Sequence, residues 1–205
     1  MSLPFFSAAY HQVVGRPLRK FAKSMKVDYP ALKLECPTTG SVSCIFIIGS
    51  SVIARWPTPN TLPAIFRGIE GLDTYDLVAN INSIYTKLDT NDVLMCYCGS
   101  NDFFDNLDTT RSINNLIAVF EVCKCKIVYL KVIYSPRMRY FVSRKTINAF
   151  NTQIESYLCS RNDCSMAVTL DLQRRDFGWD GVHLSKQGYE TLEDIIRKET
   201  DHLWP

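Results

Sequence analysis

Asp180 and His183 lie three residues apart, with Gly181 between them. One turn of chain over this spacing lets the carboxylate hold an imidazole N–H and fix the tautomer of the ring. Ser51 follows a turn that begins with Gly49, directly after an apolar run, so its hydroxyl can be exposed while its own N–H faces the same space. A serine, a base and a group that orients the base are what acyl transfer through a serine requires.

Two further positions can supply hydrogen-bond donors to a developing oxyanion. Gly71 can bring a bare backbone N–H close to a substrate, and Asn101 carries a side-chain amide. With the N–H of Ser51, these groups would form an oxyanion hole.

Such scattered residues need a scaffold that gathers them, and short apolar runs indicate which one. The runs that are rich in β-branched and apolar residues are Val42–Ile48, Ala64–Phe66, Val93–Cys98, Ile127–Val132 and Ala167–Leu170. The near-continuous apolar character of the longer ones is typical of strands buried on both faces. The sequence therefore predicts a parallel sheet with helices on each side.

Segments of helical length and mixed polarity alternate with these runs: Thr74–Lys87, Thr109–Val122, Arg144–Cys159 and Ser185–Thr200. Helix starts are expected at Asp73 or Thr74, at Asp108 or Thr109, and at Ser185. Pro57 and Pro59 stop any helix that begins after Ser51. The alternation predicts an α/β domain without internal repeats.

Ligands of open parallel sheets bind beyond the carboxyl ends of the strands. The segments that follow the expected strands are Gly49-Ser50-Ser51, Arg67–Gly71, Gly99–Asp102, Ser135-Pro136-Arg137, and the loop that ends in Trp179–His183. The candidate nucleophile, base and oxyanion donors all fall in these segments, so the topology should bring them to one edge.

Four of these segments resemble the four signature blocks of the SGNH (GDSL-like) hydrolase family, in the family's order. They are Gly49-Ser50-Ser51, Arg67–Thr74, Gly99-Ser100-Asn101-Asp102 and Asp180-Gly181-Val182-His183, and the resemblance runs from about Val42 to about Tyr189. It implies a three-layer α/β/α, flavodoxin-like fold with a five-stranded parallel sheet.

The same resemblance implies a role for each matched residue. Ser51 would be the nucleophile, Asp180 and His183 the orienting acid and the base, and Gly71 and Asn101 would join Ser51 in the oxyanion hole. Each motif alone is unspecific, and the resemblance depends on their order along the chain.

The chain departs from the family pattern at two positions. Ser50 stands where the family has Asp, as in a Gly-Ser-Ser subset of the family, and Phe66 stands where an Asn commonly precedes Arg-Gly. A serine at position 50 is expected to hydrogen-bond locally in place of the carboxylate.

Candidate substrate contacts are less defined. Arg137, after the fourth expected strand, can grip an anionic or carbonyl group or be a solvated loop charge. Trp56 and Trp179 flank the site in sequence and either line a pocket or pack in the core. Asp171 and Asp176 are weaker alternatives to Asp180, because neither has its short reach to His183.

Composition narrows the partners. The 23 basic and 21 acidic residues give a net charge of +2, without the clustered basic face of a nucleic-acid binder, and no apolar run has the length of a membrane span. We therefore expect a single domain over residues 1–205, no nucleic acid, no membrane insertion and a cytoplasmic location. The composition does not indicate an oligomeric state.

The N-terminal segment leaves one alternative open. Its basic residues, Arg16, Arg19, Lys20, Lys23 and Lys26, loosely fit a mitochondrial presequence. A helical extension over residues 1–40, packed on the domain, is the preferred interpretation.

The eight cysteines are expected to be reduced thiols. The pairs Cys96/Cys98 and Cys123/Cys125 would make a four-thiolate zinc site only if they converged, and their one-residue gaps are not those of zinc knuckles.

The sequence thus predicts a serine esterase without a metal or organic cofactor. Its substrate would be a small-molecule ester: a short acyl ester, an acetylated sugar or a lysolipid. One alternative is a catalytically weak module of the same fold that binds an ester or glycan. Another is a flavodoxin-like phosphate binder, which would need a full helix after the first strand.

Overall fold

The computed structural model describes residues 43–57, 62–80 and 88–204. All of these belong to the unit Ala31–Pro205. The expected N-terminal extension over residues 1–40 lies outside the described residues, as do residues 58–61 and 81–87.

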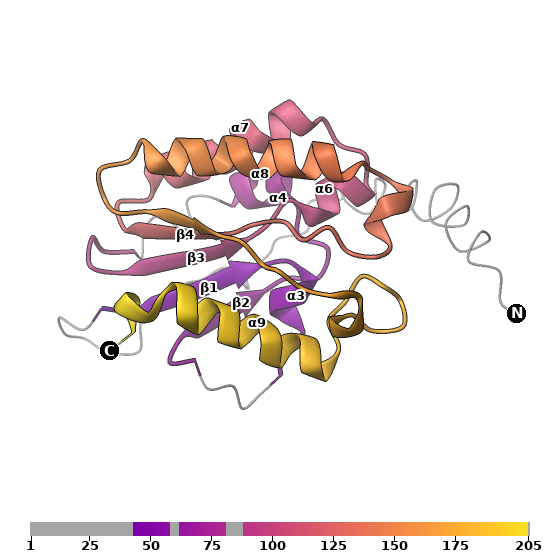
Figure 1. Cartoon of the computed structure of the whole chain (residues 1–205). Helices are drawn as coiled ribbons and strands as arrows, with labels where there is room; N and C mark the ends of the chain where they lie inside the picture. The colour runs from indigo at the N-terminus through magenta and orange to yellow at the C-terminus, as the bar shows by residue number, and fades with distance from the viewer. Residues whose placement is uncertain (1–42, 58–61, 81–87, 205) are drawn as a thin grey trace, which may run out of the picture. The chain divides into compact units, whose positions relative to one another are not determined.

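A five-stranded sheet with the order β2-β1-β3-β4-β5 forms the centre of this unit (Figure 1). The strands are β1 (Ile45–Gly49), β2 (Ile65–Gly68), β3 (Val93–Tyr97), β4 (Lys126–Leu130) and β5 (Met166–Val168). Every pairing is parallel. The expected parallel sheet is confirmed, with each strand within a few residues of its apolar run.

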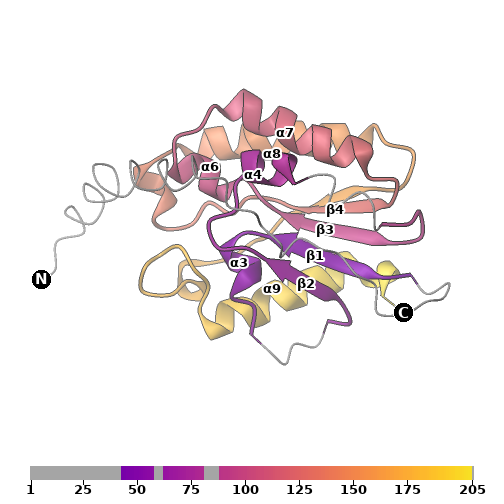
Figure 2. The ribbon, with the colours of Figure 1, turned by 180° about the vertical axis from the view of Figure 1, so that it is seen from behind.

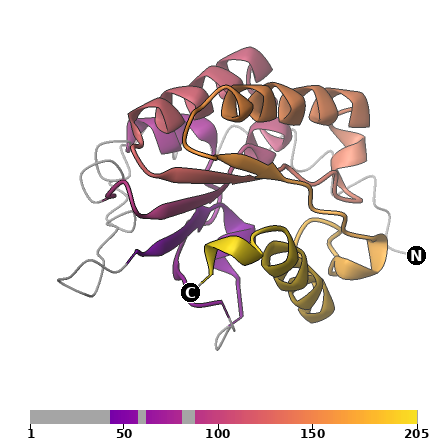
Figure 3. The ribbon, with the colours of Figure 1, turned by 60° about the vertical axis from the view of Figure 1, so that its left-hand side comes forward.

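The central strands are apolar on both faces because both faces are covered. All residues of β1 and β3 are buried. Helices α3 (Ser51–Ala54) and α9 (Lys186–Glu199) cover one face. Helices α4 (Thr74–Ala79), α6 (Ser100–Phe104), α7 (Thr109–Val122) and α8 (Arg144–Cys159) cover the other (Figures 2 and 3). The result is the expected three-layer α/β/α arrangement.

Local capping chemistry sets the helix starts. Asp73 accepts from the backbone N–H of Asp76, Asp108 from that of Arg111, and Ser185 from that of Gly188. Each carboxylate or hydroxyl satisfies a backbone donor that has no partner within the helix. These three positions were predicted, and α7 and α8 have the predicted bounds. Helix α6, one turn directly after β3, was not predicted.

The order of the strands creates a crevice next to β1. From β1 the chain passes to β2 on one side and then to β3 on the other. The segments after β1 and β3 consequently start helices on opposite faces: α3 lies with α9, and α6 lies with α7 and α8 (Figure 1). Parallel sheets bind ligands at such a point, where the order of the strands reverses. Here Ser51 and Asn101 lie on its two sides.

Among the cysteines that the structure describes, Cys44 departs from the expectation of reduced thiols, since it is disulfide-bonded. Cys96, Cys98, Cys123 and Cys125 are free and buried. No cluster of three or more potential metal ligands occurs in the described parts of the chain, so the two cysteine pairs form no zinc site there. Within the same residues, no helix is long and apolar enough to cross a membrane.

Candidate active site

The turn after β1 presents Ser51 at the carboxyl edge of the sheet. Ser51 opens the short helix α3 and is 9% exposed. The backbone N–H of Ser50 donates to the carbonyl of Tyr97 over 3.1 Å, which fastens the turn to β3. At Gly68, at the end of β2, a Cβ would lie 2.0 Å from the backbone nitrogen of Ala54. A glycine is therefore required for β2 to pass beside the helix that carries Ser51.

The side chain of Ser50 corrects one expectation. It is fully buried, and its hydroxyl has no hydrogen-bond partner among the described residues. The serine thus makes no local hydrogen bond in place of the carboxylate that the family has at this position.

A closed loop between β5 and α9 holds Asp180 and His183. Phe177 and Leu184 form an antiparallel bridge across its base. The N–H of Gly178 donates to the carbonyl of His183 over 2.7 Å. One carboxylate oxygen of Asp180 accepts from the N–H groups of Val182 (2.9 Å) and His183 (3.0 Å). The backbone of the loop therefore holds the Asp180 carboxylate in place independently of its contact with the imidazole ring of His183.

Ser51, His183 and Asp180 form a continuous chain of contacts. The second carboxylate oxygen of Asp180 lies 2.6 Å from Nδ1 of His183. Nε2 of His183 lies 3.2 Å from the Oγ of Ser51, although the two residues are 132 positions apart in the chain. With Nδ1–H held by the carboxylate, Nε2 can accept the serine proton.

The pKa of Asp180 matches this role. Partial burial acts to raise its pKa, but the hydrogen bonds from the His183 side chain and from the Val182 and His183 amides outweigh burial, so the pKa lies below its usual range. Asp180 is consequently an anion at neutral pH.

The oxyanion side of the site is built from the segments after β2 and β3. Gly71 has a φ of +75°, and the space where a Cβ would point is open. The side-chain amide of Asn101 donates to the carbonyl of Leu72 over 2.8 Å. This bond ties the Gly71 turn to α6 and leaves the second amide hydrogen of Asn101 for another acceptor.

The buried carboxylate of Asp102 stabilises the segment that follows Gly71. Asp102, 2% exposed, accepts from the N–H of Thr74 (3.1 Å) and from the Thr74 hydroxyl (2.5 Å). Burial raises the pKa of Asp102, while hydrogen bonds from Ser112 and Thr74 oppose that rise. Sequence inspection assigned no role to Asp102, although it follows Asn101 in the same motif.

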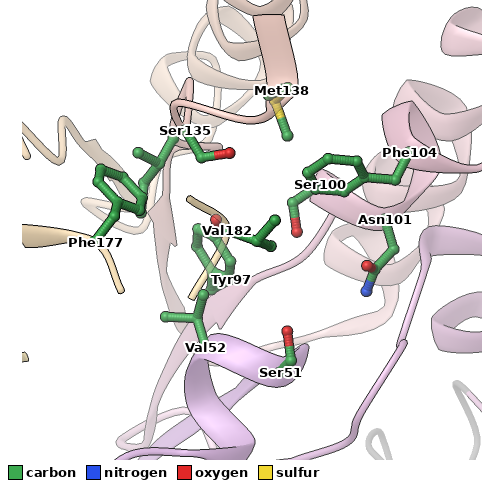
Figure 4. A pocket seen from close by; sticks show the side chains of 11 residues that line it. Ser51, Val52, Tyr97, Ser100, Asn101, Phe104, Ser135, Met138, Phe177 and Val182 are labelled. Carbon is green, nitrogen blue, oxygen red and sulfur yellow. The ribbon is translucent and has the colours of Figure 1, made fainter. Parts of the chain in front are cut away.

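A pocket opens beside Ser51 (Figure 4). The empty space at this site, open solvent included, amounts to about 310 Å³. Its walls are mainly apolar or aromatic, with three serines and one asparagine among them: Ser51, Val52, Tyr97, Ser100, Asn101, Phe104, Ile133, Ser135, Met138, Phe177 and Val182. Ser51 and Asn101 thus share one cavity.

The three suggested substrate contacts lie in different environments. Trp56 is 7% exposed and packs on Phe66 and Tyr189, with ring centroids 5.1 and 5.7 Å away, and it does not line the pocket. This placement favours its packing role. Trp179 is completely exposed beside Asp180.

Arg137 meets the base-bearing loop through its backbone, because its N–H donates to the carbonyl of Gly181 over 3.0 Å. The alternative acids contact other groups. Asp176 accepts from Gln173 and Thr191, and Asp171 accepts from the Gln173 side chain.

An ion pair that was not predicted links the end of α3 to the segment after β2. Nε of Arg55 lies 2.6 Å from Glu70, which immediately precedes Gly71. Both side chains are about half exposed, so this pair contributes little to stability. No sequence motif signalled it.

The fold, with its sheet order 2-1-3-4-5, matches that of SGNH hydrolase structures. The chain is similar to a proposed platelet activating factor from Streptococcus pneumonia, with a TM-score of 0.71, 20% identity, and coverage of 96% of this chain and 99% of that one. It is also similar to a member of the lipolytic G-D-S-L family from Veillonella parvula, with a TM-score of 0.64, 16% identity, and coverage of 78% and 99%.

A third similar structure is a catalytic mutant of an acetylxylan esterase from Geobacillus stearothermophilus. Its TM-score is 0.59 at 16% identity, with coverage of 78% of this chain and 94% of that one. No protein-family model and no curated protein matches the sequence. At these identities the likeness is one of fold.

Proposed function

We propose that this protein is a serine esterase that hydrolyses a carboxylic ester through an acyl enzyme on Ser51. The observation that carries the proposal is the unbroken chain of contacts from Ser51 through His183 to Asp180, at 3.2 and 2.6 Å. Nucleophile and base within hydrogen-bond reach, with the base oriented by a third group, are the signature of an activated serine.

In the proposed first step, the Oγ of Ser51 bonds to the ester carbonyl carbon while Nε2 of His183 takes the hydroxyl proton. The carbonyl oxygen becomes an oxyanion that accepts from the N–H groups of Ser51 and Gly71 and from the free amide hydrogen of Asn101. The C–O bond to the alcohol then breaks, and His183 returns the proton to the departing oxygen.

In the second step, water attacks the acyl enzyme, with His183 again as the base. The free acid leaves, and Ser51 regains its proton. None of the steps requires a metal or an organic cofactor, because the residues at the site supply base, acid and oxyanion donors.

Three substrate classes remain within the proposal: short acyl esters, acetylated sugars and lysolipids. The similar structures include an acetylxylan esterase and a lipolytic protein, which supports both the sugar and the lipid classes for this fold. The pocket beside Ser51 is small and partly open to solvent, which favours a short acyl group.

A catalytically weak binding module is the second candidate. The observation that favours it is Ser50, whose buried hydroxyl leaves the nucleophile turn without the carboxylate brace of the family. A phosphate-binding function has less support, because α3 is only four residues long and offers no full helix after β1.

Hydrolysis of 4-nitrophenyl acetate by the wild type, Ser51→Ala and Ser160→Ala distinguishes the two candidates. If the protein is an esterase, Ser51→Ala should lower the turnover number by at least about 10³-fold. Ser160→Ala changes an exposed serine and should leave the turnover number unchanged. Equal rates in all three proteins would favour the binding module.

A further inference from the structure

Ser135 is a buried polar residue that the proposed mechanism does not use. It follows β4 at the carboxyl edge of the sheet and is 4% exposed. Its hydroxyl has no hydrogen-bond partner among the described residues. A buried hydroxyl without a partner is unfavourable, and such exceptions in native structures call for an explanation.

The backbone holds Ser135 firmly in place. Its N–H donates to the carbonyl of Ile133 over 3.0 Å, and its own carbonyl accepts from the N–H of Met138 over 3.0 Å. The backbone of Ser135 is therefore held in place by the turn after β4.

The hydroxyl of Ser135 points into the pocket that also contains Ser51 (Figure 4). The pocket is also lined by apolar side chains, among them Val52, Ile133 and Met138. Apart from that of Ser51, the other hydroxyls in the pocket are those of Ser100 and Tyr97, which are hydrogen-bonded to each other. Among the hydroxyls that line the pocket, that of Ser135 is thus the one that is buried without a partner.

The enclosed side of the site suits the acyl group rather than the alcohol. Tyr97 and Ile133, from the ends of β3 and β4, are buried walls, and the empty volume is small. The alcohol must leave to solvent after the first step, and the fully exposed Trp179 lies on the outer side of the base-bearing loop. An acyl chain that stays on Ser51 needs a pocket of this kind.

We propose that this pocket selects a short acyl chain that carries a hydroxyl group, and that Ser135 is the residue that recognises this hydroxyl. The proposal rests on the proposed esterase function, because it names the acyl part of the ester. An unsubstituted chain would fill the apolar walls but leave Ser135 buried and unpaired. Sites that contain such a polar group discriminate against analogues that cannot bond to it.

The test compares 4-nitrophenyl esters of butyrate, 2-hydroxybutyrate and 3-hydroxybutyrate, which share one leaving group and one chain length. For each ester, kcat/KM is measured in the wild type and in Ser135→Ala, and the ratio of hydroxybutyrate to butyrate is compared between the two proteins. This comparison cancels the intrinsic reactivity of each ester.

For at least one hydroxybutyrate, the ratio should be about tenfold higher in the wild type than in Ser135→Ala. Ser135→Ala should fold with an unchanged or raised melting temperature, because it removes an unpartnered buried group. Equal ratios in the two proteins would overturn the proposal.

Ser165→Ala is the matched control. It also removes a buried hydroxyl, but one that accepts from the N–H of Ile127 at the opposite end of β4 and β5. Its substrate ratio should equal that of the wild type, whatever its stability.

A binding measurement distinguishes a wrong assignment of Ser135 from a wrong assignment of the esterase function. Calorimetry with free 2- and 3-hydroxybutyrate should show weaker binding to Ser135→Ala than to the wild type. If no ester is cleaved but this difference is found, only the esterase function fails. If esters are cleaved through Ser51 with equal ratios, only the role of Ser135 fails, and if neither hydrolysis nor binding is found, both fail.

Discussion

The amide of Asn101 donates to the carbonyl oxygen of Leu72 over 2.8 Å and thereby joins the two segments that carry the proposed oxyanion donors. Leu72 directly follows Gly71, and Asn101 lies one turn beyond β3. One side chain can thus hold the glycine turn in place and offer its second amide hydrogen to substrate. Two of the proposed oxyanion donors, Gly71 and Asn101, are therefore held together by a direct hydrogen bond between their segments.

Asn101→Ala should lower kcat by about 10²- to 10³-fold with a smaller change in KM, because it removes a donor used mainly in the transition state. Steady-state kinetics with 4-nitrophenyl acetate measure the split. A loss confined to KM would contradict a role for Asn101 at the oxyanion.

Asp102→Ala should destabilise the protein by about 2–3 kcal/mol, because it leaves the amide and hydroxyl of Thr74 without their acceptor inside the protein. We also expect a loss of kcat, since the Gly71 turn loses its brace. Urea denaturation gives the first quantity. Asp171→Ala, at an exposed position, is the control and should stay within about 0.5 kcal/mol of the wild type.

Asp180→Asn keeps the shape of the side chain but should lower kcat by up to about 10⁴-fold. The imidazole of His183 would lose its anionic partner and the group that fixes its reactive tautomer. Asp171→Ala should retain activity, as its side chain contacts Gln173 rather than His183. Equal losses in the two variants would contradict the assignment of Asp180.

The lowered pKa of Asp180 also makes a prediction about stability and pH. The folded-state pKa lies below the unfolded value of about 3.9. The stabilisation by ionised Asp180 is therefore complete above that value and is lost as the pH falls through the folded pKa. The stability difference between the wild type and Asp180→Asn should narrow below about pH 4, as urea midpoints across pH will show. A difference that is constant or grows toward acid pH would contradict this sign.

Trp179→Ala should leave stability within about 0.5 kcal/mol of the wild type, since the side chain is fully exposed. If Trp179 contacts the alcohol part of the substrate, kcat/KM should fall for acetylated sugars or lysolipids but not for 4-nitrophenyl acetate. A parallel loss on all three substrates would instead indicate a disturbed base-bearing loop.

Features that depend on local chemistry were predicted well from the sequence. The bounds of α7 and α8 follow from caps and periodic apolar positions within each segment. The strands of the sheet were recognisable because burial on both faces demands apolar runs. The motifs after the strands pointed to Ser51, Asn101 and His183 because a parallel sheet places all carboxyl ends together.

Features that depend on distant contacts were not predictable in the same way. Trp56 flanks the nucleophile in sequence, yet its environment is set by Phe66 and Tyr189. The zinc alternative depended on convergence of two cysteine pairs, which the spacing within each pair cannot reveal. Ser135 stood in a strand-end segment, but only its burial and its missing partner distinguish it from an ordinary turn serine.

Covalent labelling with a fluorophosphonate, followed by peptide mapping, determines whether Ser51 is an activated nucleophile. Attack on phosphorus requires an activated hydroxyl, so we expect one label per chain, on Ser51, and its loss in both Ser51→Ala and His183→Ala. Labelling at another residue, or no labelling of the folded wild type, would contradict the claim that Ser51 is an activated nucleophile.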